Sequence, residues 1–526
     1  MKILYFTLIA IIVFGFSVIS TSNPVFGQIT MGGPIRTVHF QFSQMASSGK
    51  NVYVVYQQNV NNGGSYHVYF TKSSDGGRNF GNTIELDNGS GVQPVLASYG
   101  NNVYVAWENG YTGYPPSYVL LAKSIDDGNT FDKPIILDNK LNSSSVITQL
   151  VADKNHLFAV IDELGETPPY ISDTYFLASH DNGSTWGQKI ELLPYPVFEN
   201  SLGYNISIQQ VEKNILVSGE NKISCTDNPN VCNYVIFFRK STDLGSSFGK
   251  EINVTTVINP VQLQMAVSGN NVYLVWATLV DNSQVLFFAK SNDGGSTFST
   301  PVILSQKSGD SEWPHIVAGG NNVYFIWKYD NAGVLSTSRD IFGRLSAHQS
   351  GIFFVKSTDG GNTLSQPVNL SGDIGASYFS GISISHNNLY ASWTSIREDK
   401  ENVFFSKSTD NGTTFDNPIN LTGRSDAFFG QIVSSDDNVY VAGGTSYPGD
   451  ILWFKASNDG GSSFGLLTTL DRGFSNPGSI SRISPEVHIV NNQNTSNNDM
   501  FVLAEVEIPI AAGIAVGVFM FTRKGK

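Results

Sequence analysis

The chain has 526 residues, of which only 14% are charged, and it contains 51 glycines. Its formal net charge of −13 excludes the basic footprint that a nucleic-acid-binding surface requires. Few charges together with abundant Gly, Asn, Ser and Thr favour many short strands joined by polar turns over long helices.

The N-terminal segment MKILYFTLIAIIVFGFSVISTSNPVFGQ has the features of a secretory signal peptide. Lys2 precedes an apolar run over residues 3–19, and small and polar residues lead to a cleavage point after Gly27. We therefore expect residues 1–27 to be removed and residues 28–526 to be secreted or displayed on the cell surface. A buried strand or an uncleaved membrane anchor is the alternative, and an uncleaved anchor would leave the same residues outside the cytoplasm.

An eight-residue segment, which we call the box, recurs eight times with the pattern S-x-D-x-G-x-x-aromatic, as in SNDGGSTF at 291–298. Leu364 alone breaks the aromatic position, and successive aspartates are 49 to 66 residues apart. Each box lies in a unit with four short apolar runs, which is typical of the blades of a β-propeller. The box aspartates are Asp75, Asp126, Asp181, Asp243, Asp293, Asp359, Asp410 and Asp459.

The second apolar run of each unit, such as NVYVAW at 102–107, is apolar on both faces. This pattern indicates a sheet that is covered on both sides by neighbouring blades. Four tryptophans share one position of this run and are expected to pack between blades, with a sugar-stacking ring as the alternative. They are Trp107, Trp276, Trp327 and Trp393.

The two ends of the chain supply further strand patterns. GPIRTV at 33–38 has no unit in front of it, and three apolar runs follow the eighth unit. We therefore predict an all-β protein, a single closed β-propeller of four-stranded blades over residues 28–526, with about nine blades. In this prediction the N- and C-terminal strands share a blade and close the ring; eight blades is the alternative.

The residue types of the box predict a structural staple. Its Gly permits the positive φ of a tight turn, its Asp can accept backbone N–H groups, and its aromatic residue buries a large apolar area. Eight equivalent carboxylates favour eight staples over one catalytic site. Calcium binding is the alternative, although an EF-hand-type loop requires several carboxylates at alternating positions.

The only cysteines, Cys225 and Cys232, lie in CTDNPNVC and are predicted to form a disulfide in an exported protein. No further Cys or nearby His would complete a metal site around them, so we expect no metal there. The sequence also contains no motif for a cofactor.

The box resembles the Asp-box, or bacterial neuraminidase (BNR) repeat, of sialidases and other secreted propellers. The resemblance covers about residues 40–471 and implies a propeller whose boxes lie at the periphery, away from the functional face. Members of this group bind glycans or proteins, or hydrolyse sugars. Sialidases hold the substrate carboxylate with three arginines, the first in an F/Y-R-I-P stretch; here GPIRTVHF offers Arg36 without the following Ile-Pro.

Because the boxes join the third and fourth strands of each unit, the opposite face carries the longer loops. Residues 328–350 form the longest insertion, and neighbouring loops add arginines, carboxylates and a tryptophan. Arginine grips carboxylates, tryptophan stacks on sugar rings, and paired carboxylates can cleave glycosidic bonds. A solvated loop set with internal ion pairs is the alternative. The candidate ligand-binding residues are Glu312, Trp313, Arg339, Arg344, Arg397, Glu398, Arg424 and Asp426.

The sequence thus predicts a non-catalytic module that recognises a cell-surface glycan or protein. An exo-glycosidase of sialidase type is the alternative, and a structural envelope component is a third hypothesis. The C-terminal run IPIAAGIAVGVFMF, 508–521, is shorter than the roughly 20 residues that span a membrane, so we predict a strand with a membrane anchor as the alternative. The oligomeric state is left open.

Overall fold

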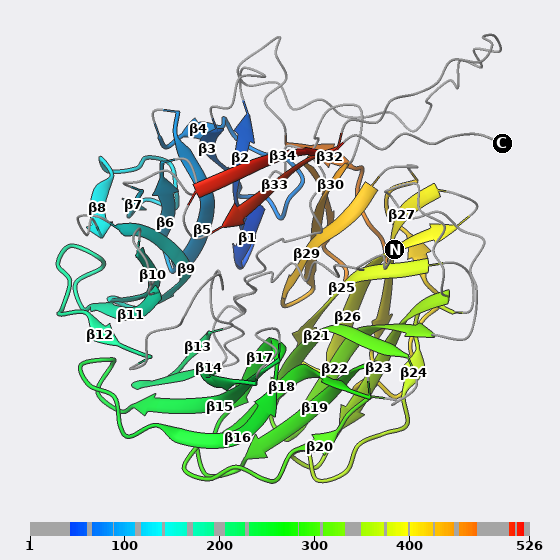
Figure 1. Cartoon of the computed structure of the whole chain (residues 1–526). Coiled ribbons are helices and arrows are strands. Elements are labelled where there is room, and N and C mark those ends of the chain that lie inside the picture. Colours follow the sequence, from blue (N-terminus) through cyan, green and yellow to red (C-terminus); the bar gives the residue numbers. More distant parts are fainter. Residues whose placement is uncertain are drawn as a thin grey trace.

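The computed structural model describes residues 43–59, 66–87, 89–110, 117–138, 143–165, 172–193, 206–226, 231–281, 283–305, 309–331, 349–372, 376–397, 400–423, 427–445, 452–470, 504–510 and 513–519. These residues form eight four-stranded antiparallel sheets and one two-stranded sheet. In each four-stranded sheet every strand pairs with the next strand along the chain. Figure 1 shows the eight sheets arranged as blades around a centre, so the chain is a β-propeller.

The first four blades contain sixteen strands. Blade 1 consists of β1 (Ser43–Ser48), β2 (Asn51–Asn59), β3 (Tyr66–Ser73) and β4 (Ile84–Glu85). Blade 2 consists of β5 (Gly91–Tyr99), β6 (Asn102–Asn109), β7 (Tyr118–Ser124) and β8 (Ile135–Asp138). Blade 3 consists of β9 (Ser143–Asp153), β10 (His156–Gly165), β11 (Ser172–Ser179) and β12 (Ile190–Glu191). Blade 4 consists of β13 (Ser207–Val211), β14 (Asn214–Cys225), β15 (Cys232–Ser241) and β16 (Ile252–Ile258).

The other four blades follow the same order. Blade 5 consists of β17 (Val261–Ser268), β18 (Asn271–Val280), β19 (Ser283–Ser291) and β20 (Val302–Ile303). Blade 6 consists of β21 (Asp310–Gly319), β22 (Asn322–Asn331), β23 (Gln349–Ser357) and β24 (Val368–Asn369). Blade 7 consists of β25 (Ala376–Ser385), β26 (Asn388–Arg397), β27 (Lys400–Ser408) and β28 (Ile419–Asn420). Blade 8 consists of β29 (Ala427–Ser435), β30 (Asn438–Thr445), β31 (Trp453–Ser457) and β32 (Thr468–Thr469).

The first strand of each blade lies nearest the centre, and the short fourth strand lies at the rim (Figure 1). Second strands are buried on both faces because each blade is covered by a neighbour on either side. In β6, Val103 and Trp107 pack at the junction with blade 1, whereas Tyr104 and Ala106 pack at the junction with blade 3. The rim strands are covered on one side only, so that Val302 of β20 is 49% exposed. The four tryptophans expected between blades are buried there, which confirms that prediction.

The core consists of eight hydrophobic clusters, one for each junction between neighbouring blades. One of them joins Met45 and Val54 of blade 1 to Val433 and Phe454 of blade 8. The amide of Gln431 in β29 adds two hydrogen bonds to the backbone of Met45 in β1, at 2.7 and 3.0 Å. Blade 8 therefore packs directly on blade 1.

This closure corrects two predictions from the sequence. The predicted number of nine blades was wrong and the eight-blade alternative is confirmed, because blade 8 packs directly on blade 1. The blade shared by the two chain ends was wrong for the same reason; each described blade is built from consecutive strands. The predicted strand at 33–38 lies outside the described residues.

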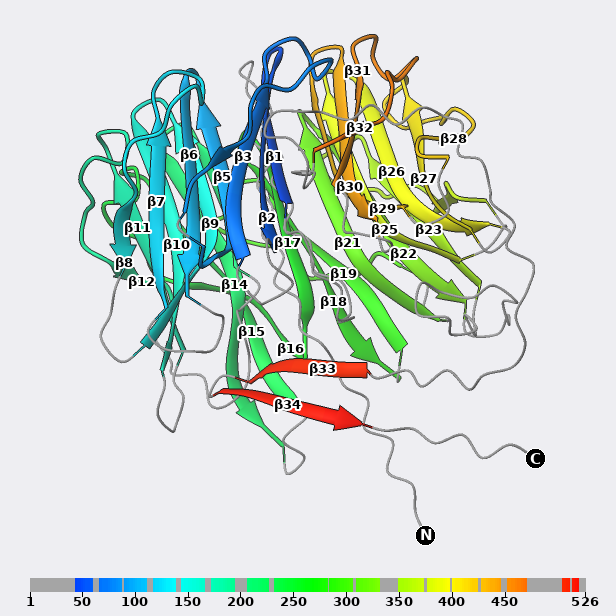
Figure 2. The ribbon, with the colours of Figure 1, turned by 90° about the horizontal axis from the view of Figure 1, so that it is seen from above.

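The C-terminal run forms a hairpin of its own. β33 (Ala504–Ile510) pairs antiparallel with β34 (Gly513–Phe519), as the strand interpretation predicts, but they form a separate two-stranded sheet. Figure 2 shows this hairpin toward one end of the blades. Among the described residues there is no helix long and apolar enough to cross a membrane.

Candidate functional site

The eight boxes share one hydrogen-bond pattern, for which Asp293 in blade 5 is representative. Its Oδ1 accepts the Ser291 hydroxyl at 2.6 Å and the Thr297 backbone N–H at 2.9 Å, and its Oδ2 accepts the Thr297 hydroxyl at 2.7 Å. The Gly295 N–H donates to Ser291 Oγ at 2.8 Å, with φ of 85° at the glycine. These bonds to the Ser291 and Thr297 groups lower the pKa of Asp293 to about 2.

The same contacts recur at every box aspartate, whose carboxylate oxygens are both engaged by donors within the turn. A carboxylate that several N–H and O–H groups stabilise in its charged form holds a turn rather than transferring protons. These are the contacts that we expect of a structural staple. The disulfide predicted between Cys225 and Cys232 is also present.

A lysine directly before the box serine links neighbouring blades, a contact that sequence analysis missed. Lys356 Nζ of blade 6 donates to the Asn411 carbonyl at 3.1 Å and to Thr413 Oγ1 at 2.7 Å, both in the box of blade 7. The pattern K-S-x-D was readable in the sequence, but not that its lysine reaches the next blade. Six lysines make such a contact: Lys72, Lys123, Lys240, Lys290, Lys356 and Lys407.

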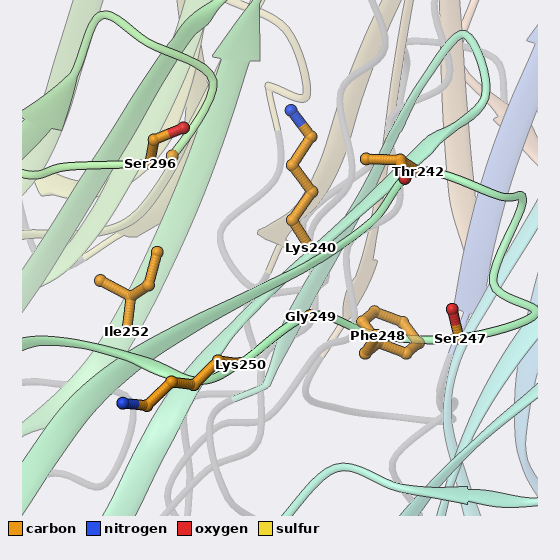
Figure 3. A pocket seen from close by; sticks show the side chains of 9 residues that line it. Lys240, Thr242, Ser247, Phe248, Gly249, Lys250, Ile252 and Ser296 are labelled. Carbon is orange, nitrogen blue, oxygen red and sulfur yellow. The ribbon is translucent and has the colours of Figure 1, made fainter.

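Two shallow pockets lie between boxes of neighbouring blades. One, of about 350 Å³, is lined by Lys240, Phe248 and Lys250 of blade 4 and by Ser296 of blade 5 (Figure 3). The other, of about 470 Å³, lies at the junction of blades 8 and 1 beside Arg78. Neither contains a residue of the predicted ligand site, and both are gaps between consecutive staples.

The opposite edge of blade 6 brings together two of the predicted ligand residues. Lys328 Nζ in β22 contacts Glu312 Oε2 at 3.1 Å and Asp330 Oδ2 at 2.6 Å. The same ammonium group lies 4.9 Å from the centroid of the Trp313 ring, within the range of a cation–π interaction. Burial alone would lower the pKa of Lys328, but the two carboxylates raise it above its ordinary value. We call these four residues the blade 6 cluster.

Trp313 stands in a β-bulge of the innermost strand of blade 6. Its φ is 53°, a left-handed conformation that a bulky side chain rarely adopts, and the pairing of β21 with β22 shifts register between Glu312 and His315. The Trp313 N–H donates to Gln262 Oε1 of blade 5 at 2.6 Å. The same bulge occurs at Gln93 of blade 2 and Gln262 of blade 5, where φ is 50° and 62°, so it is a repeated feature of the blades that places a tryptophan at this position only in blade 6 among these three.

The other predicted ligand residues are not placed by the structure. Arg397 ends strand β26, and nothing is described of its side chain. The arginine-rich site on this face therefore stays a prediction, and the lysine of the blade 6 cluster is the cation that sequence analysis overlooked. The residues outside the described part are Arg339, Arg344, Glu398, Arg424 and Asp426.

A row of buried carboxyl groups occupies one position of the second strand in consecutive blades. Glu108 of β6, Asp162 of β10 and Glu220 of β14 each lie six residues after the start of their strand and are at most 5% exposed. Burial raises the pKa of Glu108 to about 8 and that of Asp162 to about 7. The Thr174 hydroxyl donates to Asp162 at 2.6 Å. Groups sealed between blades in this way cannot touch a substrate.

Comparisons with known proteins add likeness of fold only. No family model matches the chain, and no curated protein matches it. Similar solved structures include an ulvan lyase that represents a new polysaccharide lyase family, with a TM-score of 0.42, 11% identity, and coverage of 82% of this chain and 94% of that chain. The Trypanosoma rangeli sialidase in complex with sialic acid has a TM-score of 0.35 and 11% identity, and the match covers 76% of this chain and 80% of that chain.

A third similar structure is the β-propeller domain of the Trilobed protease from Pyrococcus furiosus. Its TM-score is 0.39 at 12% identity, covering 73% of this chain and 98% of that chain. All three likenesses are too remote to carry an argument about activity, so function has to be argued from this chain's own residues.

Proposed function

We propose that this protein is an exported Asp-box β-propeller that recognises glycans without cleaving them. The observation that carries the proposal is the blade 6 cluster, in which the strained Trp313 lies beside Lys328, Glu312 and Asp330. Sugar-binding sites combine an aromatic surface with a few fixed polar groups. The predicted arginines of the neighbouring loops would add contacts to an acidic sugar.

Recognition is favoured over hydrolysis because of where the perturbed acids lie. A glycosidase needs one carboxylic acid that is protonated near neutral pH and reaches the glycosidic oxygen. Among the described residues, burial raises the pKa values of Glu108, Asp162 and Glu251. Glu108 is 0% and Asp162 3% exposed. Glu251 is partly exposed, but it directly precedes the rim strand β16 of blade 4 and is not part of the blade 6 cluster. In the blade 6 cluster both carboxylates are engaged in ion pairs with Lys328.

An extracellular location fits the disulfide between Cys225 and Cys232, because disulfides persist mainly in oxidising compartments. It also fits the signal peptide predicted at residues 1–27. Fractionation of cells that produce the full chain tests this part of the proposal: mature protein that begins near residue 28 supports it, and full-length protein in the cytoplasm contradicts it.

The binding proposal is tested on a glycan array that includes neutral, sialylated, uronic and sulfated oligosaccharides, using residues 28–526. Trp313→Ala should weaken binding at least roughly tenfold, because a stacking aromatic side chain is lost, whereas Trp313→Phe should retain part of it. Ile125→Ala is the matched control, since Ile125 is 67% exposed in the box of blade 2 and should not matter. Release of sugar from any bound glycan would instead establish the glycosidase alternative.

A further inference from the structure

Blade 1 holds a cluster of three potential metal ligands that lies apart from the blade 6 cluster. His67 lies near the start of β3, Glu85 ends β4, and Asp87 follows two residues later. His67 Nδ1 is 2.8 Å from Glu85 Oε1 and 3.8 Å from Asp87 Oδ1. Within the described part of the chain, this is the one group of three or more His, Cys, Asp or Glu residues with ligand atoms all within 4.8 Å of one another.

These separations suit a single ion. A divalent metal such as zinc lies about 2.0–2.2 Å from imidazole nitrogen and carboxylate oxygen, so ligand atoms around it are roughly 3–3.5 Å apart. The two distances from His67 Nδ1, 2.8 and 3.8 Å, bracket that range. Small side-chain rotations of His67 and Glu85 would therefore place three ligand atoms around one ion.

The histidine ring is held in position before any ion binds. It stacks on Tyr69 with ring centroids 6.1 Å apart and an interplanar angle of 15°. The loop also comes close to the ring at Gly89, where a Cβ would stand 3.0 Å from His67 Cε1 and φ is 103°. Only glycine permits this approach, and the result is a ring whose Nδ1 faces the two carboxylates.

Asp87 is fixed beside the histidine by backbone donors. Its side chain is fully buried; its Oδ1 accepts the Val68 N–H at 3.0 Å, and its Oδ2 accepts the Ser90 N–H at 3.1 Å and the Gly91 N–H. In blades 5, 6 and 7 the backbone N–H that matches that of Val68 is satisfied by a neutral hydroxyl, from Ser305, Ser371 and Thr422. Blade 1 therefore has a rigidly held carboxylate where these blades have a hydroxyl, and its Oδ1 lies 3.8 Å from His67 Nδ1.

We propose that His67 Nδ1, Glu85 and Asp87 bind one divalent transition-metal ion, with zinc as the best match to a nitrogen–oxygen–oxygen ligand set. The ion would tie the third strand of blade 1 to the fourth strand and to the loop that leads into blade 2. It would neutralise the buried carboxylate of Asp87 and complete a junction at which only Glu85, 34% exposed, and His67, 17% exposed, face solvent.

The experiment is isothermal titration of untagged, chelator-treated residues 28–526 with zinc chloride at pH 7.5. One equivalent should bind to the wild type, with Mn²⁺ binding more weakly. His67→Ala should abolish that equivalent, and Glu85→Gln should weaken it at least roughly tenfold, because a charged ligand is lost. Glu85→Gln changes a partly exposed rim residue, so it keeps the test valid if His67→Ala fails to fold.

The control is His156→Ala. His156 and His180 have ring nitrogens 3.0 Å apart on the box edge of blade 3 and could capture zinc as a pair. Unchanged binding in this variant supports the blade 1 site. The proposal is overturned if the wild type binds no zinc, if Glu85→Gln and His67→Ala bind like the wild type, or if only His156→Ala loses the ion.

Discussion

Replacing Glu108 by glutamine should make the protein more stable at alkaline pH. Glu108 lies in β6 at the junction of blades 2 and 3, with no exposed surface. Burial raises the pKa of its carboxyl group from 4.5 to about 8, and the nearby Ser117 hydroxyl offsets only part of that effect. The folded protein therefore keeps the proton at neutral pH, whereas the unfolded chain releases it.

The sign and size of the effect follow from proton linkage. Between pH 4.5 and about 8 the folded state binds one more proton at Glu108 than the unfolded state does, so stability falls as pH rises through this window. Each pH unit of the window costs about 1.4 kcal/mol, which gives on the order of 5 kcal/mol as an upper bound. Glu108→Gln removes this dependence: it should match the wild type near pH 4.5 and exceed it at pH 8.5.

The assay is urea unfolding at pH 5, 6, 7, 8 and 8.5, followed by the fluorescence of the buried tryptophans. Asp162 also lowers the free energy of unfolding as the pH rises between 3.8 and about 7. Glu108→Gln alone should therefore flatten the plot of unfolding free energy against pH, and Glu108→Gln combined with Asp162→Asn should flatten it further. Asp132→Asn, at an exposed carboxylate, is the control and should run parallel to the wild type. If the plot of unfolding free energy against pH for Glu108→Gln is also parallel to that of the wild type, Glu108 ionises normally and the reasoning fails.

Two other substitutions and one reduction test the boxes, the lysine links and the disulfide. Asp293→Ala should lower the free energy of unfolding at pH 7 by about 1–3 kcal/mol through lost hydrogen bonds, and the control Ser296→Ala should lower it much less. In urea titrations the difference between Asp293→Ala and the wild type should shrink as the pH falls from about 4 toward 2, because the carboxylate then takes up its proton. Lys356→Met should lower the free energy of unfolding by about 1 kcal/mol, because two hydrogen bonds across the junction of blades 6 and 7 are lost. An unchanged melting temperature would mean that these contacts do not stabilise the fold. Reducing Cys225–Cys232 should cost roughly 2–3 kcal/mol, and equal unfolding curves with and without reductant would contradict it.

The architecture could be read from the sequence because its signals are local and repeated. The box specifies a turn through Ser, Asp and Gly within a few residues, and runs such as NVYVAW specify strands covered on both faces. The number of blades was misjudged for a different reason. Strand patterns at the chain ends say nothing of whether Met45 packs on Gln431, and that contact closes the ring at eight.

The candidate sites were predictable only in part. Glu312 and Trp313 stood out as types of side chain, but their partner Lys328 lies on the neighbouring strand, across a shifted register. His67 and Glu85 are eighteen positions apart and match no ligand spacing, so no sequence pattern could place them together.

The sequence by itself determined the repeated unit, the eight box turns and the disulfide, because each depends on residues that are close along the chain. Tertiary structure alone decided the closure between blades 8 and 1, the lysine links from blade to blade, and the burial that raises the pKa of Glu108. The reason is physical: these properties depend on which surfaces of separate blades face each other, and the free energy of burying a charge is set by neighbours that are distant in sequence.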